Sequence, residues 1–368
     1  MRKGWEYKRW KEVLTIINGK NQSAVVDENG EYPIYGSGGI MGYANNWLCP
    51  GNCVIIGRKG NINKPIFVET KFWNVDTAFG LNANKEYLLP KFLYYFCLDY
   101  NFERHNKAVT IPSLTKADLL KIDIPLPPKS TQLAIVSELD KINELIRLKK
   151  EQLKDFDNLA QSLFYEMFGD PVENEKGWEV KKIGDLALVK TGPFGSMLHK
   201  EDYICDGIPL VNPIHMKDYK IVPDLDFTIS KEKASELENY LLKRNDVVFA
   251  RRGDIGRCAI VSEAEQGFIC GTGSLFVRFS KEIESIFIMY IIRCDSFSKH
   301  LISKAKGATM LNINSNTIAD LRIPLPPLPL QRLFAQRIEQ IEREKSEVQK
   351  SIQDLETLLA SRMQYWFE

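Results

Sequence analysis

One stretch of this sequence occurs twice, and it limits what the chain can fold into. Residues 124–168 and residues 323–367 both open with Ile-Pro-Leu-Pro-Pro and continue as about forty residues of helical pattern. The two copies align without a gap at a constant offset of 199 positions. Such repetition predicts two similar halves, each a globular region followed by a long helix. The identical pairs within the helical parts are Gln132 and Gln331, Ile142 and Ile341, Asp155 and Asp354, Leu159 and Leu358, Ser162 and Ser361, and Phe168 and Phe367.

Apolar residues follow both helical stretches at alternating steps of four and three. Steps that average 3.5 residues keep one apolar seam turned toward a partner helix, which is the coiled-coil pattern. At 1.5 Å per residue, forty residues span about 60 Å. We therefore predict that the two helices pair with each other as an antiparallel coiled coil. The residues predicted to pair are Ile135, Leu139, Ile142, Ile146 and Phe156 in the first stretch and Phe334, Ile338, Ile341, Val348 and Leu355 in the second.

Each seam also carries one cation near its middle, Lys149 in the first and Lys345 in the second. A single polar residue in such a seam can set the register of the helix pair. The alternative is that the two lysines mark where a partner protein docks.

A second repeated motif marks where the halves begin. Gly-Trp-Glu occurs at residue 4 and again at residue 177, and a glycine and a proline end the first helix at residues 169–171. At 368 residues the chain also exceeds the usual size of one core. We therefore predict globular domains at residues 1–128 and 171–327, each followed by a long helix, at 129–170 and 328–368.

Within each globular region, short strand-like segments are broken by Gly, Pro and Asn. Strands are predicted at 33–35, 53–57, 64–69 and 77–81, and at 209–212, 246–250, 258–262 and 274–279. Helices are predicted at 90–98, 114–120, 284–294 and 315–321, and residues 4–18 are predicted as a short strand and a helical turn leading into a loop. Short loops without long crossovers indicate an α+β fold with mostly antiparallel sheets.

Composition is that of a folded soluble protein, with 44% hydrophobic and 26% charged residues. The formal net charge of +1 neither demands nor excludes a nucleic-acid partner. Residues 1–128 hold 16 Lys and Arg against 12 Asp and Glu, so any basic surface must be built locally. Seven irregularly spaced cysteines predict reduced thiols and no zinc site. We expect neither a signal peptide nor a membrane span, and hence a cytoplasmic protein.

Motifs for catalysis are missing from the sequence. No Walker-type phosphate loop, paired Cys/His zinc motif or Gly-x-Ser-x-Gly elbow occurs. The four histidines share no local motif with acids or cysteines. Asn-Pro-Ile-His at residues 212–215 matches the Asn-Pro-Pro-Tyr motif of amino-methyltransferases only in part, and no Gly-rich cofactor loop accompanies it. The sequence therefore predicts no catalytic residue and no metal ligand.

The globular regions instead share a loop suited to a polyanion. Residues 57–63 read Gly-Arg-Lys-Gly-Asn-Ile-Asn, and residues 250–256 read Ala-Arg-Arg-Gly-Asp-Ile-Gly. Each puts two cations directly after a strand and beside a glycine, where the backbone can approach phosphate. Arginine can also make bidentate contacts to guanine edges. The simpler interpretation is a solvated hairpin tip, but recurrence in both halves favours function. The candidates are Arg58, Lys59 and Asn61 in the first half and Arg251, Arg252 and Arg257 in the second.

Small-residue and Lys/Thr segments add weaker candidates for DNA contact. The loops at 36–42 and 191–196 are flexible in composition, and plain turns explain them equally well. Segments 107–112 and 306–311 match each other at Lys and Thr, although helix capping explains the polar residues that follow at least as well. The candidates from these segments are Ser37, Lys107, Thr110, Ser196, Lys306 and Thr309, together with Lys190 directly before the 191–196 loop.

Taken together, the Gly-Trp-Glu motif, the glycine-rich loops, the repeated Ile-Pro-Leu-Pro-Pro and the two long helices make the chain resemble the specificity subunit of type I restriction-modification systems. The resemblance covers essentially the whole chain. It implies two target recognition domains separated by antiparallel helices, each domain similar to the recognition domain of adenine-N6 methyltransferases. It also implies that the chain is not itself an enzyme.

The same resemblance implies the partners. These are double-stranded DNA, two modification subunits that carry S-adenosylmethionine and methylate adenine, and restriction subunits that use ATP and Mg²⁺. No cofactor is expected in this chain. Because the halves match in their helices but diverge between them, the DNA target is expected to be bipartite and asymmetric. Two alternatives stay open: a structural coiled-coil adaptor that reads no sequence, and a self-sufficient DNA methyltransferase.

Overall fold

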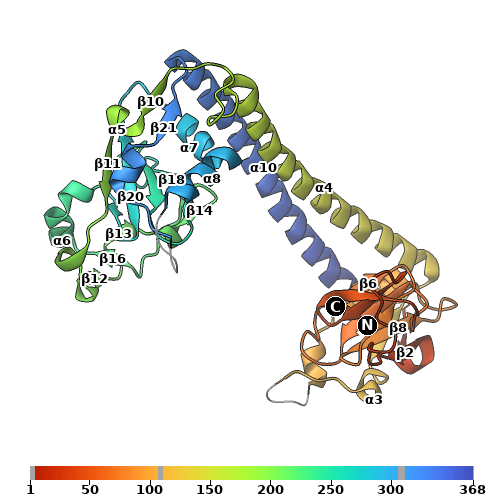
Figure 1. The fold of residues 1–368 in the computed structure, drawn as a ribbon. Coiled ribbons are helices and arrows are strands. Elements are labelled where there is room, and N and C mark those ends of the chain that lie inside the picture. The colour runs from red at the N-terminus through yellow and green to blue at the C-terminus, as the bar shows by residue number, and fades with distance from the viewer. Residues whose placement is uncertain (1–4, 107–110, 306–310, 368) are drawn as a thin grey trace. The chain divides into compact units, whose positions relative to one another are not determined.

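The structure is a computed structural model that describes residues 5–106, 111–305 and 311–367. The chain divides into two compact units, one formed by Met1–Glu151 with Gln349–Glu368 and the other by Gln152–Val348. Each unit contains one globular domain and a part of each of the two long helices, α4 (Lys129–Phe168) and α10 (Leu328–Phe367). The predicted α+β fold, with two repeated domains alternating with two long helices, is confirmed (Figure 1).

The first unit is built mainly from short strands. Its strands are β1 (Glu6–Arg9), β2 (Leu14–Asn18), β3 (Tyr32–Gly36), β4 (Gly39–Ala44), β5 (Cys53–Gly57), β6 (Ile66–Val68), β7 (Trp73–Asn74), β8 (Ala78–Ala83) and β9 (Asp123–Leu126). Its short helices are α1 (Trp10–Val13), α2 (Pro90–Asp99), the 3-10 turn η1 (Phe102–His105) and α3 (Lys116–Leu119).

The second unit repeats this plan with insertions. Its strands are β10 (Val180–Lys182), β11 (Ala187–Thr191), β12 (Tyr203–Ile204), β13 (Ile208–Val211), β14 (Met216–Lys217), β15 (Lys220–Ile221), β16 (Thr228–Ile229), β17 (Val247–Ala250), β18 (Cys258–Ile260), β19 (Ile269–Cys270), β20 (Ser274–Phe279) and β21 (Arg322–Pro324). Its helices are α5 (Ile183–Leu186), α6 (Lys231–Glu236), α7 (Ser285–Arg293), α8 (Asp295–Lys304) and α9 (Ser315–Ala319), with 3-10 turns η2 (Gly195–Met197), η3 (Lys200–Asp202), η4 (Pro213–His215) and η5 (Glu238–Tyr240).

The two domains share their main antiparallel sheet strand for strand. The antiparallel sheet β2-β8-β5-β6 of the first unit corresponds to β11-β20-β17-β18 of the second. A parallel pair accompanies each sheet, β3 with β7 and β13 with β19. The sheets are therefore mostly antiparallel, as predicted, but every domain also contains one parallel pairing that the sequence did not indicate.

The two repeated sequence motifs pair with each other. Strand β1, from the Gly-Trp-Glu region, runs antiparallel to β9, which contains the start of Ile-Pro-Leu-Pro-Pro. In the second unit β10 pairs with β21 in the same way. Prolines fit these two-stranded ribbons because each strand has a free edge. Every domain thus closes on itself where its long helix begins.

Two strands were missed. Residues 14–18 form β2, in which Leu14 and Ile16 alternate inward, whereas only one short strand and a helical turn were predicted within 4–18. Residues 39–44 form β4, although the glycine-rich stretch 36–42 was predicted as a flexible loop. Ile40 and Met41 stay exposed on β4, so this strand has no apolar alternation that would reveal it. Helices α6 and α8 were also missed.

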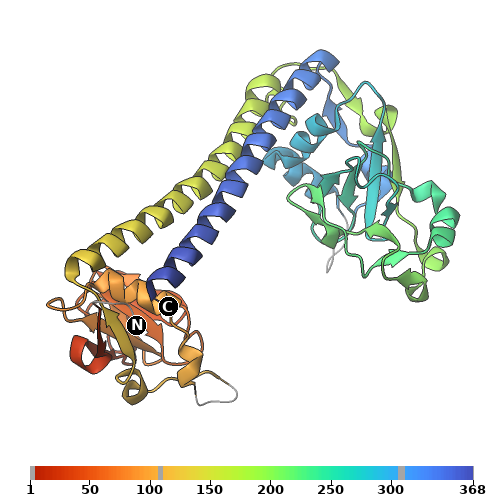
Figure 2. The ribbon, with the colours of Figure 1, turned by 180° about the vertical axis from the view of Figure 1, so that it is seen from behind.

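In the first unit, the start of α4 pairs with the end of α10. The seam residues Ile135 and Leu139 are fully buried, and Met363 of α10 belongs to the same core. Glu138 accepts hydrogen bonds from Arg362 and from the indole of Trp366. Residues more than 220 positions apart in the sequence therefore complete one core (Figures 1 and 2).

In the second unit, the end of α4 pairs with the start of α10. Phe334, Ile338 and Ile341 are buried against this part of α4. The seam cation Lys345 donates hydrogen bonds to Asp157 of α4 at 2.8 Å and to Glu342 at 3.0 Å. Burial alone would lower the pKa of Lys345, but these two carboxylates outweigh it and raise the pKa. A cross-helix ion pair in the seam is the geometry expected of a register-setting residue.

Each long helix starts at a buried glutamine that has the same role in both units. The Gln132 side chain is fully buried, accepts a hydrogen bond from the Leu89 backbone at 2.9 Å and donates to the carbonyls of Tyr87 and Pro127. Gln331 repeats this role by accepting from Glu284 N at 3.1 Å and donating to Pro326 O at 2.8 Å. One glutamine in each repeat thus ties the start of the long helix to its domain.

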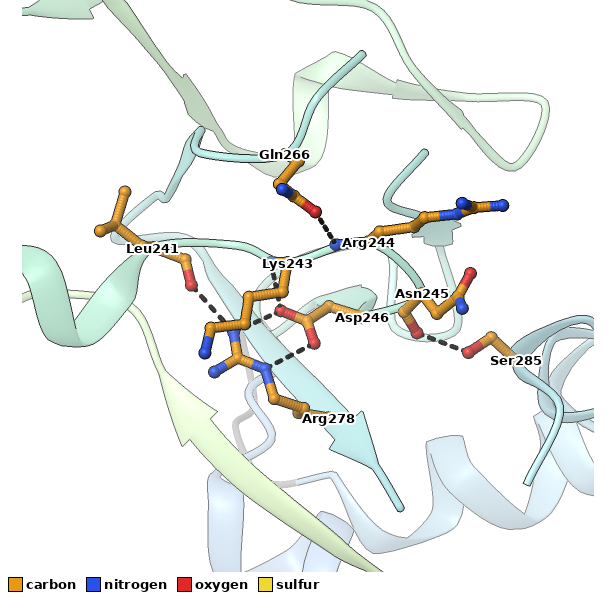
Figure 3. A network of polar contacts seen from close by, with 8 residues as sticks. All are labelled: Leu241, Lys243, Arg244, Asn245, Asp246, Gln266, Arg278 and Ser285. Atoms are coloured by element: carbon orange, nitrogen blue, oxygen red, sulfur yellow. Dashed lines mark hydrogen bonds and ion pairs between the residues drawn. The ribbon is translucent and has the colours of Figure 1, made fainter. Parts of the chain in front are cut away.

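A buried ion pair braces the second domain (Figure 3). The Asp246 carboxylate, 1% exposed, accepts hydrogen bonds from Arg278 Nε at 2.8 Å, Arg278 Nη2 at 2.6 Å and Lys243 N at 2.8 Å. Arg278 also donates to the Leu241 carbonyl, and Ser285 donates to the Asn245 carbonyl. The network fixes the turn before β17, the strand that carries the second polyanion loop.

Asp246→Ala is expected to lower the free energy of unfolding by about 3–5 kcal/mol, because it strands the partly buried Arg278 guanidinium. Asp320→Ala is the matched control, since Asp320 pairs with Lys182 through exposed side chains and should cost less than about 1 kcal/mol. Chemical denaturation measures both changes. Equal losses for the two variants would contradict the bracing role of Asp246.

The Glu138 contact predicts a pH effect on the first unit. Its hydrogen bond with Arg362 lowers the pKa of Glu138, so the contact stabilises the fold above the unfolded-state pKa, about 4.3 for glutamate, and is lost as pH falls through the lower folded value. Between pH 5 and pH 3, the parent Tm should therefore fall more steeply than that of Glu138→Gln. Parallel Tm curves, measured by circular dichroism, would show that the contact contributes nothing.

Candidate nucleic-acid interface

The polyanion loops have the same geometry in both domains. Each loop follows an inner strand of the four-stranded sheet, β5 or β17. Each exposes the tip of a tight turn. Gly60 and Gly253 occupy the same place in the two turns, with φ of 80° and 77°. Ile62 and Ile255, two residues on, are both buried and anchor the turn to the core. The predicted correspondence between residues 57–63 and 250–256 therefore extends to the backbone.

A second segment braces each loop through the same hydrogen bonds. In the first unit Gly60 N donates to Pro112 O at 3.0 Å, and Leu114 N donates to Arg58 O at 2.9 Å. In the second, Gly253 N donates to Leu311 O at 3.0 Å, and Ile313 N donates to Arg251 O at 2.9 Å. Pro112 and Leu311, the last residues of the two segments predicted from their Lys and Thr residues, therefore contact the loops. Lys107, Thr110, Lys306 and Thr309 themselves lie outside the described residues.

Helix capping was the simpler explanation of the polar residues that follow these two segments. It is confirmed for two of those residues. Thr115 caps α3 by accepting from Asp118 N, and Asn314 caps α9 by accepting from Thr317 N. These side chains stabilise the helix that follows each bracing segment.

In the first unit, the turn between β3 and β4 lies beside the polyanion loop. A side-chain carbon added at Gly60 would stand 3.9 Å from Ser37 Oγ, and one added at Gly38 would stand 3.8 Å from Asn61 Nδ2. Arg58, Lys59 and Asn61 are all exposed. The structure therefore gathers four of the predicted residues, Ser37, Arg58, Lys59 and Asn61, on one surface.

In the second unit, the loop contains buried polar atoms without partners. Arg251 Nε, Ser274 Oγ and Asn312 Oδ1 are buried and have no hydrogen-bond partner within the described structure. Ser274 pairs with Ala250 across the sheet, and Asn312 bridges Arg252, so the three atoms surround the loop. Burial lowers the pKa of Arg251, and the adjacent positive charge of Arg252 lowers it further. Unpaired buried polar groups are costly, so water or a bound ligand would be expected to satisfy these three atoms.

Arg257 is held in place by the protein itself. It forms an ion pair with Asp254 at 2.7 Å and donates to the Pro213 carbonyl at 3.2 Å. The neighbouring Asn212 side chain accepts from Gly273 N at 3.2 Å, and Gly273 O in turn accepts from Arg251 N at 3.0 Å. Residues 212–213, part of the segment that partly matches the Asn-Pro-Pro-Tyr motif of amino-methyltransferases, therefore support the loop. Sequence reasoning missed this role because it depends on contacts between distant segments.

The other two predicted residues lie outside the loop. Lys190 is half-buried on β11, and its ammonium group lies 5.0 Å from the centre of the Tyr240 ring. Ser196 is in the 3-10 turn η2, and its side chain is not among those described. A cavity of about 640 Å³ is lined by Arg257, by the β14–β15 hairpin and by the start of α8.

The cysteines and the possible metal ligands among the described residues can also be located. Cys49 and Cys53 are buried, and burial raises the pKa of Cys53 to about 11. No group of three or more His, Cys, Asp or Glu side chains is arranged to hold a metal ion in the part of the chain that the structure covers. Among the helices of that part, none has the length and apolar character that crossing a bilayer requires.

Comparison with known proteins agrees with this geometry. The model of the type I restriction modification DNA specificity domain matches residues 2–155 and 175–357. The chain is 23% identical to the type I restriction enzyme MjaVIII specificity subunit of Methanocaldococcus jannaschii, covering 96% of this chain and 92% of that protein. It is 20% identical to the EcoBI specificity subunit of Escherichia coli, covering 83% and 70%.

Two solved structures share the fold. The S subunit of the type I restriction-modification system of M. genitalium has a TM-score of 0.60 at 15% identity, with 99% of this chain and 96% of that chain covered. A chain from a structure of type I R-M complex assembly and conformational transition has a TM-score of 0.64 at 18% identity, with 99% and 97% covered.

These matches define a DNA-recognition subunit that performs no catalysis of its own. The chain belongs to the family of type I restriction-modification specificity subunits, and its repeated domains are the two target recognition domains of that family. The resemblance predicted from the repeated motifs is confirmed, and the interpretation as a self-sufficient methyltransferase is wrong.

Gly60→Ala tests the geometry of the first loop. A non-glycine residue in the left-handed region costs about 1–2 kcal/mol, so this variant should be destabilised by that amount. Gly38→Ala, in the adjacent turn, meets only Asn61 Nδ2 at 3.8 Å and should be nearly neutral. Unfolding midpoints in urea measure both. A neutral Gly60→Ala would mean that the turn does not require its left-handed backbone.

Proposed function

We propose that this chain reads a bipartite, asymmetric DNA target through its two domains. One observation carries the proposal: the same cationic turn, with the same bracing hydrogen bonds, occurs in both domains. A plain hairpin tip needs no such duplication. In the second domain, the buried Arg251, Ser274 and Asn312 atoms without partners favour a ligand that supplies hydrogen bonds at the loop. DNA offers both phosphate oxygens and base edges to such groups.

The side chains of the two loops differ while their backbones match. Asn61 of the first loop corresponds to Asp254 of the second, and Asp254 is already paired with Arg257. An amide matches the donor and acceptor pattern of adenine, whereas arginine matches guanine. Two different sets of side chains on one frame support two different half-sites, and therefore an asymmetric target.

The proposal extends to partners and cofactors. The family resemblance supports two modification subunits, which would carry S-adenosylmethionine and methylate adenine, and restriction subunits, which would use ATP and Mg²⁺. This chain would hold no cofactor and would direct these subunits to its target in the cytoplasm. The α4–α10 pair would then hold the two readers at a fixed spacing, as in other readers of paired half-sites.

Arginine variants test the reading function. The assembled chain and modification subunit should select one two-part motif from a pool of random-sequence duplexes. Arg58→Ala should reduce base selectivity in only one half of that motif. The double variant Arg251→Ala, Arg252→Ala should reduce it only in the other half. Each lost bidentate base contact should weaken binding about 5- to 150-fold, which corresponds to about 1–3 kcal/mol. Anisotropy on the selected duplex measures this loss.

Lys154→Ala, on the exposed surface of α4, is the control and should leave the motif unchanged. A uniform loss of affinity, with a salt slope reduced by about one per cation, would assign the arginines to phosphates. An unchanged motif and affinity in all arginine variants would favour the competing adaptor function, in which the helices hold partners and the domains read no DNA.

A further inference from the structure

The most exposed apolar side chains of this protein gather around the polyanion loops. Among the described residues, the six large apolar side chains with the greatest exposure are between 57% and 68% exposed. One of them, Leu133, lies on α4, and the other five belong to segments beside the two loops. Exposed apolar residues are normally scattered singly, so this grouping indicates a binding surface. We call Ile40, Met41 and Ile111 the first rim, and Phe194 and Ile214 the second rim.

The first rim comes from two segments that touch the first loop. Ile40 and Met41 belong to β4, and the turn that precedes β4 lies beside Gly60. A side-chain carbon added at Gly36 would stand 2.6 Å from Met41 Sδ, so Met41 lies over this turn. Ile111 directly precedes the residue whose carbonyl accepts a hydrogen bond from Gly60 N at 3.0 Å. Three apolar side chains therefore flank one cationic turn.

Ile214 is presented by a turn that contacts the second loop. It directly follows Pro213, whose carbonyl accepts a hydrogen bond from Arg257 Nη1 at 3.2 Å. The next residue, His215, is buried, and its backbone N donates to Asn212 O at 2.9 Å. Ile214 itself is 68% exposed, although both of its neighbours are held by these contacts. Its position is therefore set before a ligand binds, which lowers the entropy cost of binding.

Phe194 is presented by a segment that packs closely on the sheet. Gly192 N donates to Ser274 O at 3.0 Å, and Ser274 pairs with Ala250 at the start of the second loop. A side-chain carbon added at Gly192 would stand 1.9 Å from Gly271 O, so the two backbones are in close contact. The Phe194 ring, 62% exposed, therefore stands on a backbone that is fixed beside the second loop.

Acidic residues are absent from the sequence segments that carry the rims. Two other exposed apolar residues, by contrast, have acidic neighbours. Val26, 55% exposed, directly precedes Asp27, and Leu225, 53% exposed, lies between Asp224 and Asp226. A surface without carboxylates accepts a polyanion, whereas an acidic surface repels it. The segments without Asp or Glu are residues 32–68, 104–117, 187–200 and 207–217.

The surroundings of the rims indicate which group of DNA they contact. Arginine reaches guanine edges in the major groove, and the apolar group that base pairs present in that groove is the thymine methyl. A rim beside an arginine loop therefore faces thymine methyl groups. The one carboxylate within the two loops, Asp254, is neutralised by Arg257 at 2.7 Å. We propose that each rim contacts thymine methyl groups of its half-site. This inference rests on the proposed function, which supplies the DNA.

Deoxyuridine substitution tests the proposal, because uracil differs from thymine only in the missing methyl group. The assembled chain and modification subunit should bind the selected duplex about fourfold more weakly for each contacted methyl that is removed, which corresponds to about 0.8 kcal/mol. The double variant Ile40→Ala, Met41→Ala should lose this dependence only in the half-site that Arg58→Ala alters. The double variant Phe194→Ala, Ile214→Ala should lose it only in the other half-site. Fluorescence anisotropy measures each affinity.

Leu225→Ala is the matched control, since Leu225 is an exposed apolar residue of the second domain with acidic neighbours. This variant should keep the full thymine dependence in both half-sites. Because all of the replaced side chains are exposed, every variant should keep the parent circular dichroism spectrum and Tm.

The possible failures are distinguishable. An assembled complex that selects no motif would overturn the proposed function itself. A selected duplex that binds equally well with thymine or uracil would overturn only the contact with methyl groups. Rim variants that weaken the thymine and uracil duplexes equally would also overturn this contact. A rise in 2-aminopurine fluorescence that requires the rims would overturn it as well, because it would show an apolar wedge between base steps, as minor-groove binders use.

Discussion

The apolar seam between α4 and α10 is the interaction on which the rest of the structure depends. A forty-residue helix with one apolar stripe is unstable alone in water, and tertiary burial of that stripe supplies most of its stability. Here the burial also completes both domains, because Phe367 packs into the first domain and Phe168 into the second. The last residues of α10 are therefore part of the core of the first domain. Neither domain core is complete without helix residues that are distant in sequence.

Specific contacts convert this apolar seam into a defined joint. The buried glutamines Gln132 and Gln331 orient each helix on its domain, and the Lys345–Asp157 pair crosses the seam. Hydrophobic burial is non-directional, so it fixes neither register nor orientation. Directed polar contacts, at both ends and in the middle of the helices, fix the register and the orientation. The proposed reading of two half-sites depends on such contacts, because loosely held helices would accept many spacings.

The parts of the structure that depend on periodicity could be predicted from the sequence. The seam, the repeat and the helix-pair fold follow from a pattern of 3.5 residues over forty positions. Strand β4 could not be predicted, because Ile40 and Met41 are exposed and its glycines show no alternation. Long-range polar contacts, such as Asp246 with Arg278 or Arg257 with the Pro213 carbonyl, leave no local signal at all. The cationic loops were found because they occur twice, while the buried polar atoms around Arg251 needed the structure.

The two halves of this molecule share one backbone frame, whereas the side chains that their two loops present differ. Methylome sequencing of cells that express the chain with its modification subunit, compared with cells that lack the chain, tests this most directly. The account predicts one added adenine-methylation motif made of two different half-sites separated by a gap of constant length. Methylation without any gapped motif, or no change when the chain is removed, would contradict it.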